Sequence, residues 1–90
     1  MLVALIAKDK PGAQAIRAEN RPAHLDYLKS TDLVAQAGPL LDAEGGMVGS
    51  LIILDVADLA AAQAWADNDP YAKAGLFGSV DLIHWNRVIS

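Results

Sequence analysis

Two short segments of this chain, Met1–Ala7 and Met47–Leu54, are apolar at both odd and even positions. Side chains of a β-strand alternate between the two faces of a sheet, so a strand with this pattern is best accommodated where both faces are covered. Charged residues 8–10 follow the first segment, and the glycine pair 45–46 precedes the second. The sequence therefore predicts a sheet with two apolar faces.

Two other segments have the composition of helices. Residues 13–29 are rich in helix-forming residues, but Pro22 disfavours helix just before it, so we expect a kinked helix or two short ones. The alanine-rich segment Leu59–Asp67 follows Asp58, a residue type that caps helix N-termini, and it is ended by Asp69-Pro70. Each half of the chain thus contributes one helical segment.

Two further strands complete the pattern. We expect one at about Leu33–Ala37, ended by Gly38-Pro39, and one at Val80–Ile89, where branched and aromatic residues gather. The order β-α-β-β-α-β predicts an α+β, ferredoxin-like fold with a four-stranded antiparallel sheet, in one domain spanning residues 1–90. Two helices can cover only one face of such a sheet. The other apolar face predicts a homodimer in which two sheets pack face to face.

The composition argues against several classes of partner. The formal net charge is −4 at pH 7, whereas binding to nucleic acid or to an anionic membrane would call for a basic surface. The chain has no cysteine, which removes disulfides and thiolate metal sites and suits a reducing cytoplasm. The apolar start lacks the basic region of a signal peptide, and no apolar run is long enough for a membrane span. We expect a cytoplasmic protein with no nucleic-acid and no membrane partner.

His24 is the strongest candidate for chemistry near neutral pH, because the chain has only two histidines and no cysteine. On a helical wheel, Leu25 and Leu28 lie at the centre of the buried stripe, and His24 lies on its flank, about 40° from Leu28. This position suits a structural histidine bonded to a backbone carbonyl as well as a catalytic one. The other histidine, His84, is far away in the sequence, so the pair makes no metal motif and we expect no metal site.

Asp69 and Ser50 are two further candidates. Asp69 precedes Pro70, so it could cap a short turn, or it could orient His24 and stabilise the imidazolium. No GxSxG-type turn surrounds Ser50, which favours a hydrogen-bonding role over a nucleophilic one. The pattern predicts a proton-transfer pair and a polar positioning group, and it leaves open whether they meet.

Several motifs of the chain occur together in one known family. Residues 21–25 read RPAHL, 37–39 read AGP, 49–50 read GS, and 64–71 read AWADNDPY, followed by AGL. In this order, and over nearly the whole chain, they resemble the YCII-related (YciI-like) family. The resemblance implies a dimeric α+β barrel on a ferredoxin-like fold and an active site centred on His24 and Asp69. It also implies that Ser50 and Tyr71 line the same pocket and bind substrate.

The resemblance implies a type of reaction and no particular substrate. Some relatives dehydrochlorinate chlorinated hydroxyquinols, and related barrels isomerise lactones or act as cofactor-independent monooxygenases. We therefore expect a small lyase or isomerase without a cofactor, in which His24 moves a proton on a small aromatic or enolic molecule and Asp69 orients the imidazole. The alternative is a non-catalytic homodimer that binds a small metabolite through His24.

Overall fold

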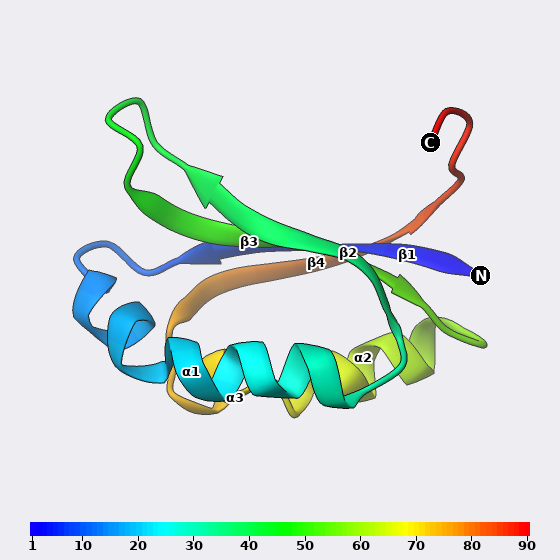
Figure 1. The fold of residues 1–90 in the computed structure, drawn as a ribbon, viewed down its shortest axis with the longest axis horizontal. Helices are drawn as coiled ribbons and strands as arrows, with labels where there is room; N and C mark the ends of the chain where they lie inside the picture. The colour runs from blue at the N-terminus through cyan, green and yellow to red at the C-terminus, as the bar shows by residue number, and fades with distance from the viewer.

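The computed structural model describes residues 1–90, and it forms one twisted sheet with helices below it (Figure 1). The elements in chain order are β1 (Leu2–Asp9), α1 (Gln14–Ser30), β2 (Val34–Leu41), β3 (Met47–Asp55), α2 (Leu59–Asp67), α3 (Pro70–Lys73) and β4 (Phe77–Trp85). The strand order is β2-β3-β1-β4, and all neighbouring strands are antiparallel. The expected ferredoxin-like arrangement is confirmed, with α3 as one additional helical turn.

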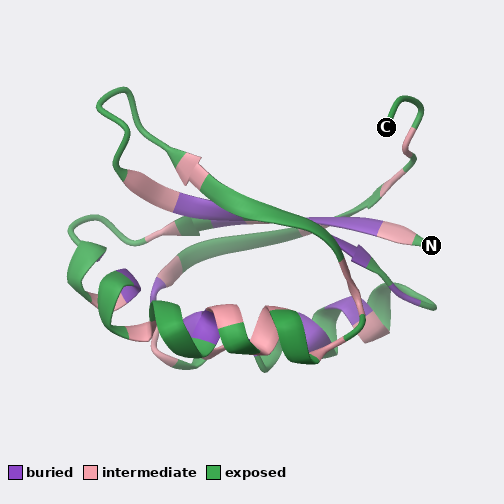
Figure 2. Cartoon of the chain, viewed as in Figure 1, coloured by how far each residue is buried: buried purple, intermediate pink, exposed green.

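The main core lies between the sheet and the helices. Leu5 pairs with Ile52 on β3, and the side chains of both point toward the helices, as do those of their neighbours two residues away along each strand. Figure 2 accordingly shows buried residues on the central strands and on the helix surfaces that face them. This buried cluster comprises Val3, Leu5, Ala7, Ile52, Leu54, Val56, Ala62, Trp65 and Ala66.

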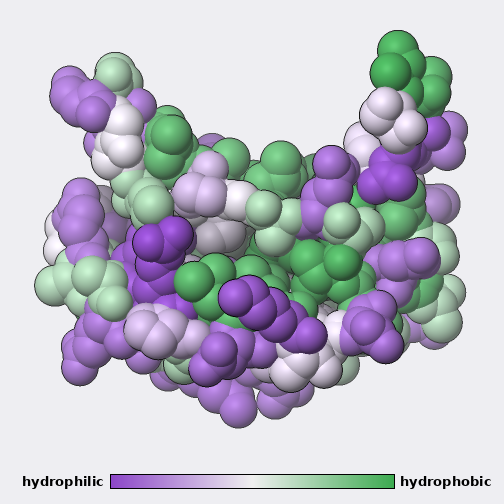
Figure 3. Space-filling model, in the orientation of Figure 1, coloured by the Kyte–Doolittle hydropathy of each residue, from purple (hydrophilic) through white to green (hydrophobic).

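The opposite face of the sheet carries no helix. Ala4 and Ile53 on this face are nevertheless buried by their neighbours, whereas Leu51 is 39% exposed and Ile83 is 52% exposed. Figure 1 shows the β2–β3 hairpin and the C-terminal segment rising on either side of this face, and Figure 3 shows apolar residues along the concave edge between them. The prediction of a second apolar sheet face is therefore correct; we call it the open face, comprising Leu2, Ala4, Ile6, Leu51, Ile53, Ile83 and Trp85.

Helix α1 runs through Pro22 without a break in its helical assignment, so it is one helix and not two. A proline in a helix lacks an N–H and crowds the preceding turn, which bends the axis. Figure 1 shows the first turns of α1 at an angle to the longer segment below the sheet, in agreement with the expected kink. Helix α2 has the expected bounds, and the Asp58 side chain accepts a hydrogen bond from the Ala61 backbone at 2.8 Å.

The first and third predicted strands differ from β1 and β3 by one or two residues at their ends. The other two differ more, because the pairing partners set their bounds. Strand β2 does not end at Gly38-Pro39 but continues through Leu41, since β2 is an edge strand, where a proline is tolerated. Strand β4 is Phe77–Trp85 rather than Val80–Ile89. Trp85 already pairs with Leu2 at the start of β1, so residues beyond Trp85 have no strand to join.

None of the helices combines the length and the apolar character needed to cross a membrane.

Candidate active site

Helix α1 presents polar side chains to the sheet. Its two buried residues are Arg17, 5% exposed, and His24, 6% exposed, which lie seven positions apart and therefore on the same face. Leu25 and Leu28 are only half-buried. The helical-wheel position given to His24 was therefore wrong: the ring lies inside the fold and not on the flank. The wheel used apolar residues alone, whereas the inward face of α1 is partly charged.

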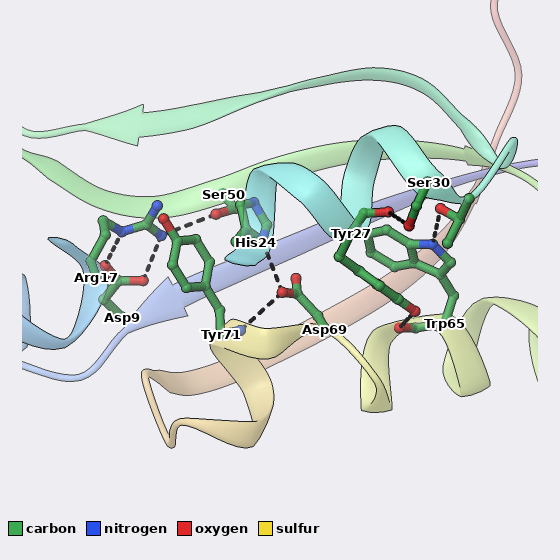
Figure 4. Close-up of polar contacts among 10 residues, drawn as sticks. Asp9, Arg17, His24, Tyr27, Ser30, Ser50, Trp65, Asp69 and Tyr71 are labelled. Atoms are coloured by element: carbon green, nitrogen blue, oxygen red, sulfur yellow. Dashed lines mark hydrogen bonds and ion pairs between the residues drawn. The ribbon is translucent and has the colours of Figure 1, made fainter. Parts of the chain in front are cut away.

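The imidazole of His24 contacts the carboxylate of Asp69, which lies 45 residues further along the chain. His24 Nδ1 is 2.8 Å from Asp69 Oδ1, and Asp69 is 1% exposed (Figure 4). The same oxygen also accepts a hydrogen bond from the Tyr71 backbone N–H at 2.9 Å. An ionised carboxylate only accepts, so Nδ1 is the donor and Nε2 carries the lone pair of the neutral ring.

Asp69 also caps a helix. It is the N-cap residue of α3, with Pro70 at the first helical position. The expected cap is confirmed, and the same oxygen contacts His24; that Asp69 stabilises an imidazolium stays a prediction. The other oxygen, Oδ2, is buried without a hydrogen-bond partner in the chain.

Tyr71 packs between Arg17 and His24, the two buried polar side chains of α1. Its ring stacks on His24 with centroids 3.9 Å apart, and the Arg17 guanidinium lies 4.6 Å from its centroid. Figure 4 shows the three side chains in this order, Arg17, Tyr71, His24. The stack fixes the plane of the imidazole as well as its distance from Asp69.

Arg17 is held by two residues of the sheet. Its Nε and Nη2 donate to the Asp9 carboxylate at 2.7 and 2.9 Å, and Nη2 also donates to Ser50 Oγ at 3.0 Å. This is the bidentate geometry that arginine forms with carboxylates. Burial lowers the pKa of Arg17, but the hydrogen bond and charge of Asp9, together with Tyr71, raise it above its ordinary value.

Tyr71 keeps its proton at neutral pH. Burial raises the pKa of its hydroxyl above 10.0, and the positive charges of Arg17 and Arg21 only partly offset that effect. The hydroxyl can therefore donate a hydrogen bond to a ligand.

These side chains line a pocket of about 200 Å³ between α1 and the β2–β3 part of the sheet. It brings together three of the four predicted site residues, His24, Ser50 and Tyr71, and Asp69 lies directly behind His24. The remaining lining is Arg17, Arg21, Leu25, Leu28, Ala37, Gly38, Pro39, Met47 and Ile52. The arrangement supplies an oriented imidazole, a fixed guanidinium and a phenol to one small cavity.

Sequence reasoning missed Arg17 and Asp9. The spacing of seven residues between Arg17 and His24 was a usable signal, because it puts both on one helix face. Asp9 gave no such signal, since it was interpreted as a charge that bounds the first strand. Nowhere do three or more histidine, aspartate or glutamate side chains gather as metal ligands would.

Comparisons with known proteins point to one family. A model of the YCII-related domain matches residues 1–86. Protein YciI of Escherichia coli O6:H1 is 35% identical over 97 aligned positions, covering 98% of this chain and 99% of the relative. An uncharacterised protein of Haemophilus influenzae is 34% identical over the same shares of each chain.

A solved structure is similar over almost the same range. It is the 5-chloro-2-hydroxyhydroquinone dehydrochlorinase TftG of Burkholderia phenoliruptrix AC1100, in complex with 2,5-dihydroxybenzoquinone. It is 33% identical to this chain, the match covers 96% of this chain and 94% of the other, and the TM-score is 0.89.

Proposed function

Since the chain belongs to the YCII-related domain family, we propose that it is a small enzyme of the lyase or isomerase type in which His24 transfers a proton. The observation that carries the proposal is the buried contact of 2.8 Å between His24 Nδ1 and Asp69 Oδ1. It leaves Nε2 free of partners within the chain, on a residue that lines the pocket. We further propose that residues 1–90 act as one domain in the cytoplasm.

The proposed step begins with neutral His24. Nε2 takes a proton from a carbon or hydroxyl of the substrate, and the carboxylate of Asp69 stabilises the imidazolium that forms. In an elimination, the electron pair released moves through the substrate and expels the leaving group with its own pair. In an isomerisation, Nε2 returns the proton to a different carbon. Stacking on Tyr71 keeps the ring in place throughout.

One similar protein, TftG, supports both an enzyme and a reaction class. TftG is a dehydrochlorinase, and loss of HCl requires a base for the proton and a leaving chloride. TftG binds a dihydroxyquinone, which has one ring, and the pocket of about 200 Å³ in this chain has a size that suits a one-ring molecule. We therefore propose small aromatic or enolic molecules as the substrate class for this chain.

The test compares two histidine variants. His24→Asn keeps a hydrogen-bonding side chain but cannot carry the proton, so turnover should fall roughly 10²- to 10⁴-fold while substrate affinity changes only several-fold. His84→Asn is the matched control, because His84 is exposed on β4 and lines no part of the pocket. Turnover is followed by chloride release and ultraviolet absorbance on 5-chloro-2-hydroxyhydroquinone and a panel of chlorinated quinols and lactones.

Two outcomes oppose the proposal. Turnover that is unchanged in His24→Asn removes His24 from the chemistry. Tight binding of panel members by the wild type without turnover of any of them favours the alternative, a non-catalytic metabolite-binding protein.

We also propose that two copies associate through their open faces. Leu51 and Ile83 leave apolar surface exposed at the middle of the sheet, where no element of the same chain covers it. The C-terminal segment rises beside the same face (Figure 1), and its exposed Val88 and Ile89 would add to the contact.

A further inference from the structure

The pocket contains an arginine that the proposed proton transfer does not use. A guanidinium has five N–H groups, and Arg17 directs three of them, through Nε and Nη2, to Asp9 and Ser50. Nη1 donates to neither of these residues, and the Tyr71 hydroxyl lies close enough to the guanidinium for a hydrogen bond between them to affect the pKa of both groups. No nitrogen of Arg17 is both buried and without a partner, and Arg17 lines the pocket, so Nη1 keeps access to solvent. Figure 4 shows it on the side of the guanidinium away from Asp9.

This free end of Arg17 is rigidly placed. The bidentate contact with Asp9 fixes the plane of the guanidinium, and the Tyr71 ring lies against it at 4.6 Å. A donor that is already oriented loses little conformational entropy when it binds a ligand. Nη1 is therefore held in position for a hydrogen-bond acceptor on a bound ligand.

Two neighbours make this end of the pocket suited to an anionic acceptor, one as a neutral donor and one as a positive charge. The Tyr71 hydroxyl is near enough to Arg17 and Arg21 for their charges to affect its pKa, and it remains protonated and able to donate. Arg21 lines the same pocket from the next turn of α1. None of the twelve lining residues is acidic, and the two carboxylates behind them, Asp9 and Asp69, already face Arg17 and His24.

We propose that Arg17 Nη1 and the Tyr71 hydroxyl bind an anionic oxygen of the ligand, with Arg21 adding charge at the rim. The ligand class is then a small planar oxyanion: a phenolate, an enolate or a carboxylate. The inference rests on the proposed function only in that His24 acts on the same molecule. Arg17, which would hold the ionised oxygen, lies two turns of α1 before His24, and Tyr71 lies between them. Charge-assisted hydrogen bonds to such a donor are about twice as strong as neutral ones, so the site selects by charge.

The test measures preference for charge with two quinones. In 2,5-dihydroxybenzoquinone each hydroxyl is a vinylogous carboxylic acid and is ionised at neutral pH, whereas 2,5-dimethoxybenzoquinone cannot ionise. Calorimetry on the wild type should show the dihydroxyquinone binding at least tenfold more tightly. Arg17→Gln should reduce that ratio roughly ten- to a hundredfold. Lys29→Gln removes the same charge from an exposed site on the same helix, outside the pocket, and should leave the ratio unchanged.

Arg17→Gln leaves Asp9 without its partner and could unfold the chain, so Asp9→Asn/Arg17→Gln is measured beside it. The double variant removes both charges and should show the same loss of preference. Equal affinity of the wild type for both quinones, a preference that survives in both Arg17 variants, or no binding of the dihydroxyquinone at millimolar concentration would each overturn the inference.

Failure of the proposed function gives a different pattern. If His24→Asn keeps the preference for the anion while the wild type turns nothing over, the oxyanion site stands and proton transfer does not. If turnover depends on His24 but neither Arg17 variant changes the preference, proton transfer stands and the oxyanion site does not.

Discussion

At the scale of single residues, the pocket is organised by two side chains of α1 that are each held in place by a carboxylate. Asp69 orients His24, and Asp9 orients Arg17. The Tyr71 ring lies between the two pairs, against the imidazole on one side and the guanidinium on the other (Figure 4). A buried ionised group is tolerated only when paired, which is why both carboxylates belong to the site although neither lines the pocket.

Tyr71 makes stability depend on pH in the alkaline range. Its pKa is raised by burial above the value of 10.0 that it has in the unfolded chain. Below that pH both states keep the proton, and the group has no effect on the free energy of unfolding. Above it the unfolded chain loses the proton first, so the folded state binds more protons and stability falls as pH rises. Denaturant unfolding measured from about pH 8 to about pH 11 should show this decline.

Tyr71→Phe keeps the ring and removes the titrating group, so its decline should be shallower than that of the wild type. Burial also raises the pKa of Tyr27, the only other tyrosine, so the variant should retain part of the slope. Identical slopes for variant and wild type would contradict the assignment to Tyr71.

At the scale of elements, strand β3 fits against β1 with no room for a side chain at one point. A Cβ added at Gly49 would collide with the carbonyl oxygen of Ala7. Glycine at this position therefore keeps β3 close to β1 and sets Ser50, the next residue, at the correct depth to accept from Arg17. The hydrogen-bonding role predicted for Ser50 therefore needs Gly49 as well, because a larger residue there would move the strand that carries Ser50.

Gly49→Ala should lower the free energy of unfolding by about 2 kcal/mol or more, because the backbone atoms it meets cannot move aside without shifting a strand. Gly38→Ala is the matched control: it lies opposite Leu51 in the same sheet, and a Cβ there meets nothing within 4 Å. The control should stay within about 0.5 kcal/mol of the wild type. Equal stability of the two variants in urea unfolding would show that the sheet adapts at Gly49.

At the scale of the whole molecule, the sheet separates two different surfaces. The helix side holds the core and the pocket, and the open face holds apolar side chains that a chain of this size has no further element to cover. Helix α1 is also tied to α2, since the Tyr27 hydroxyl donates to the Trp65 carbonyl at 2.7 Å. The helices are thus fixed to one another by contacts within one chain, whereas the open face of the sheet has no covering element in that chain.

Leu51→Glu should convert the proposed dimer into a monomer. A charge buried between two sheets costs about 3 kcal/mol, which weakens association roughly a hundredfold. Leu59→Glu is the matched control, because Leu59 is also an exposed leucine, at 47%, but starts α2 on the other side of the sheet. Sedimentation at micromolar concentration should show a dimer for the wild type and the control only. A wild type that sediments as a monomer would refute association through the open face.

Sequence patterning alone determined the element order, both apolar faces of the sheet and the Asp58 cap of α2, because each depends on neighbouring residues or on the period of two. The tertiary structure decided the strand ends, since Pro39 is tolerated only at an edge and β4 stops where β1 begins. It also decided the site: contact between His24 and Asp69, and the placement of Arg17 by Asp9, join residues from separate elements. Such contacts follow from how elements pack, and no local pattern along the chain encodes them.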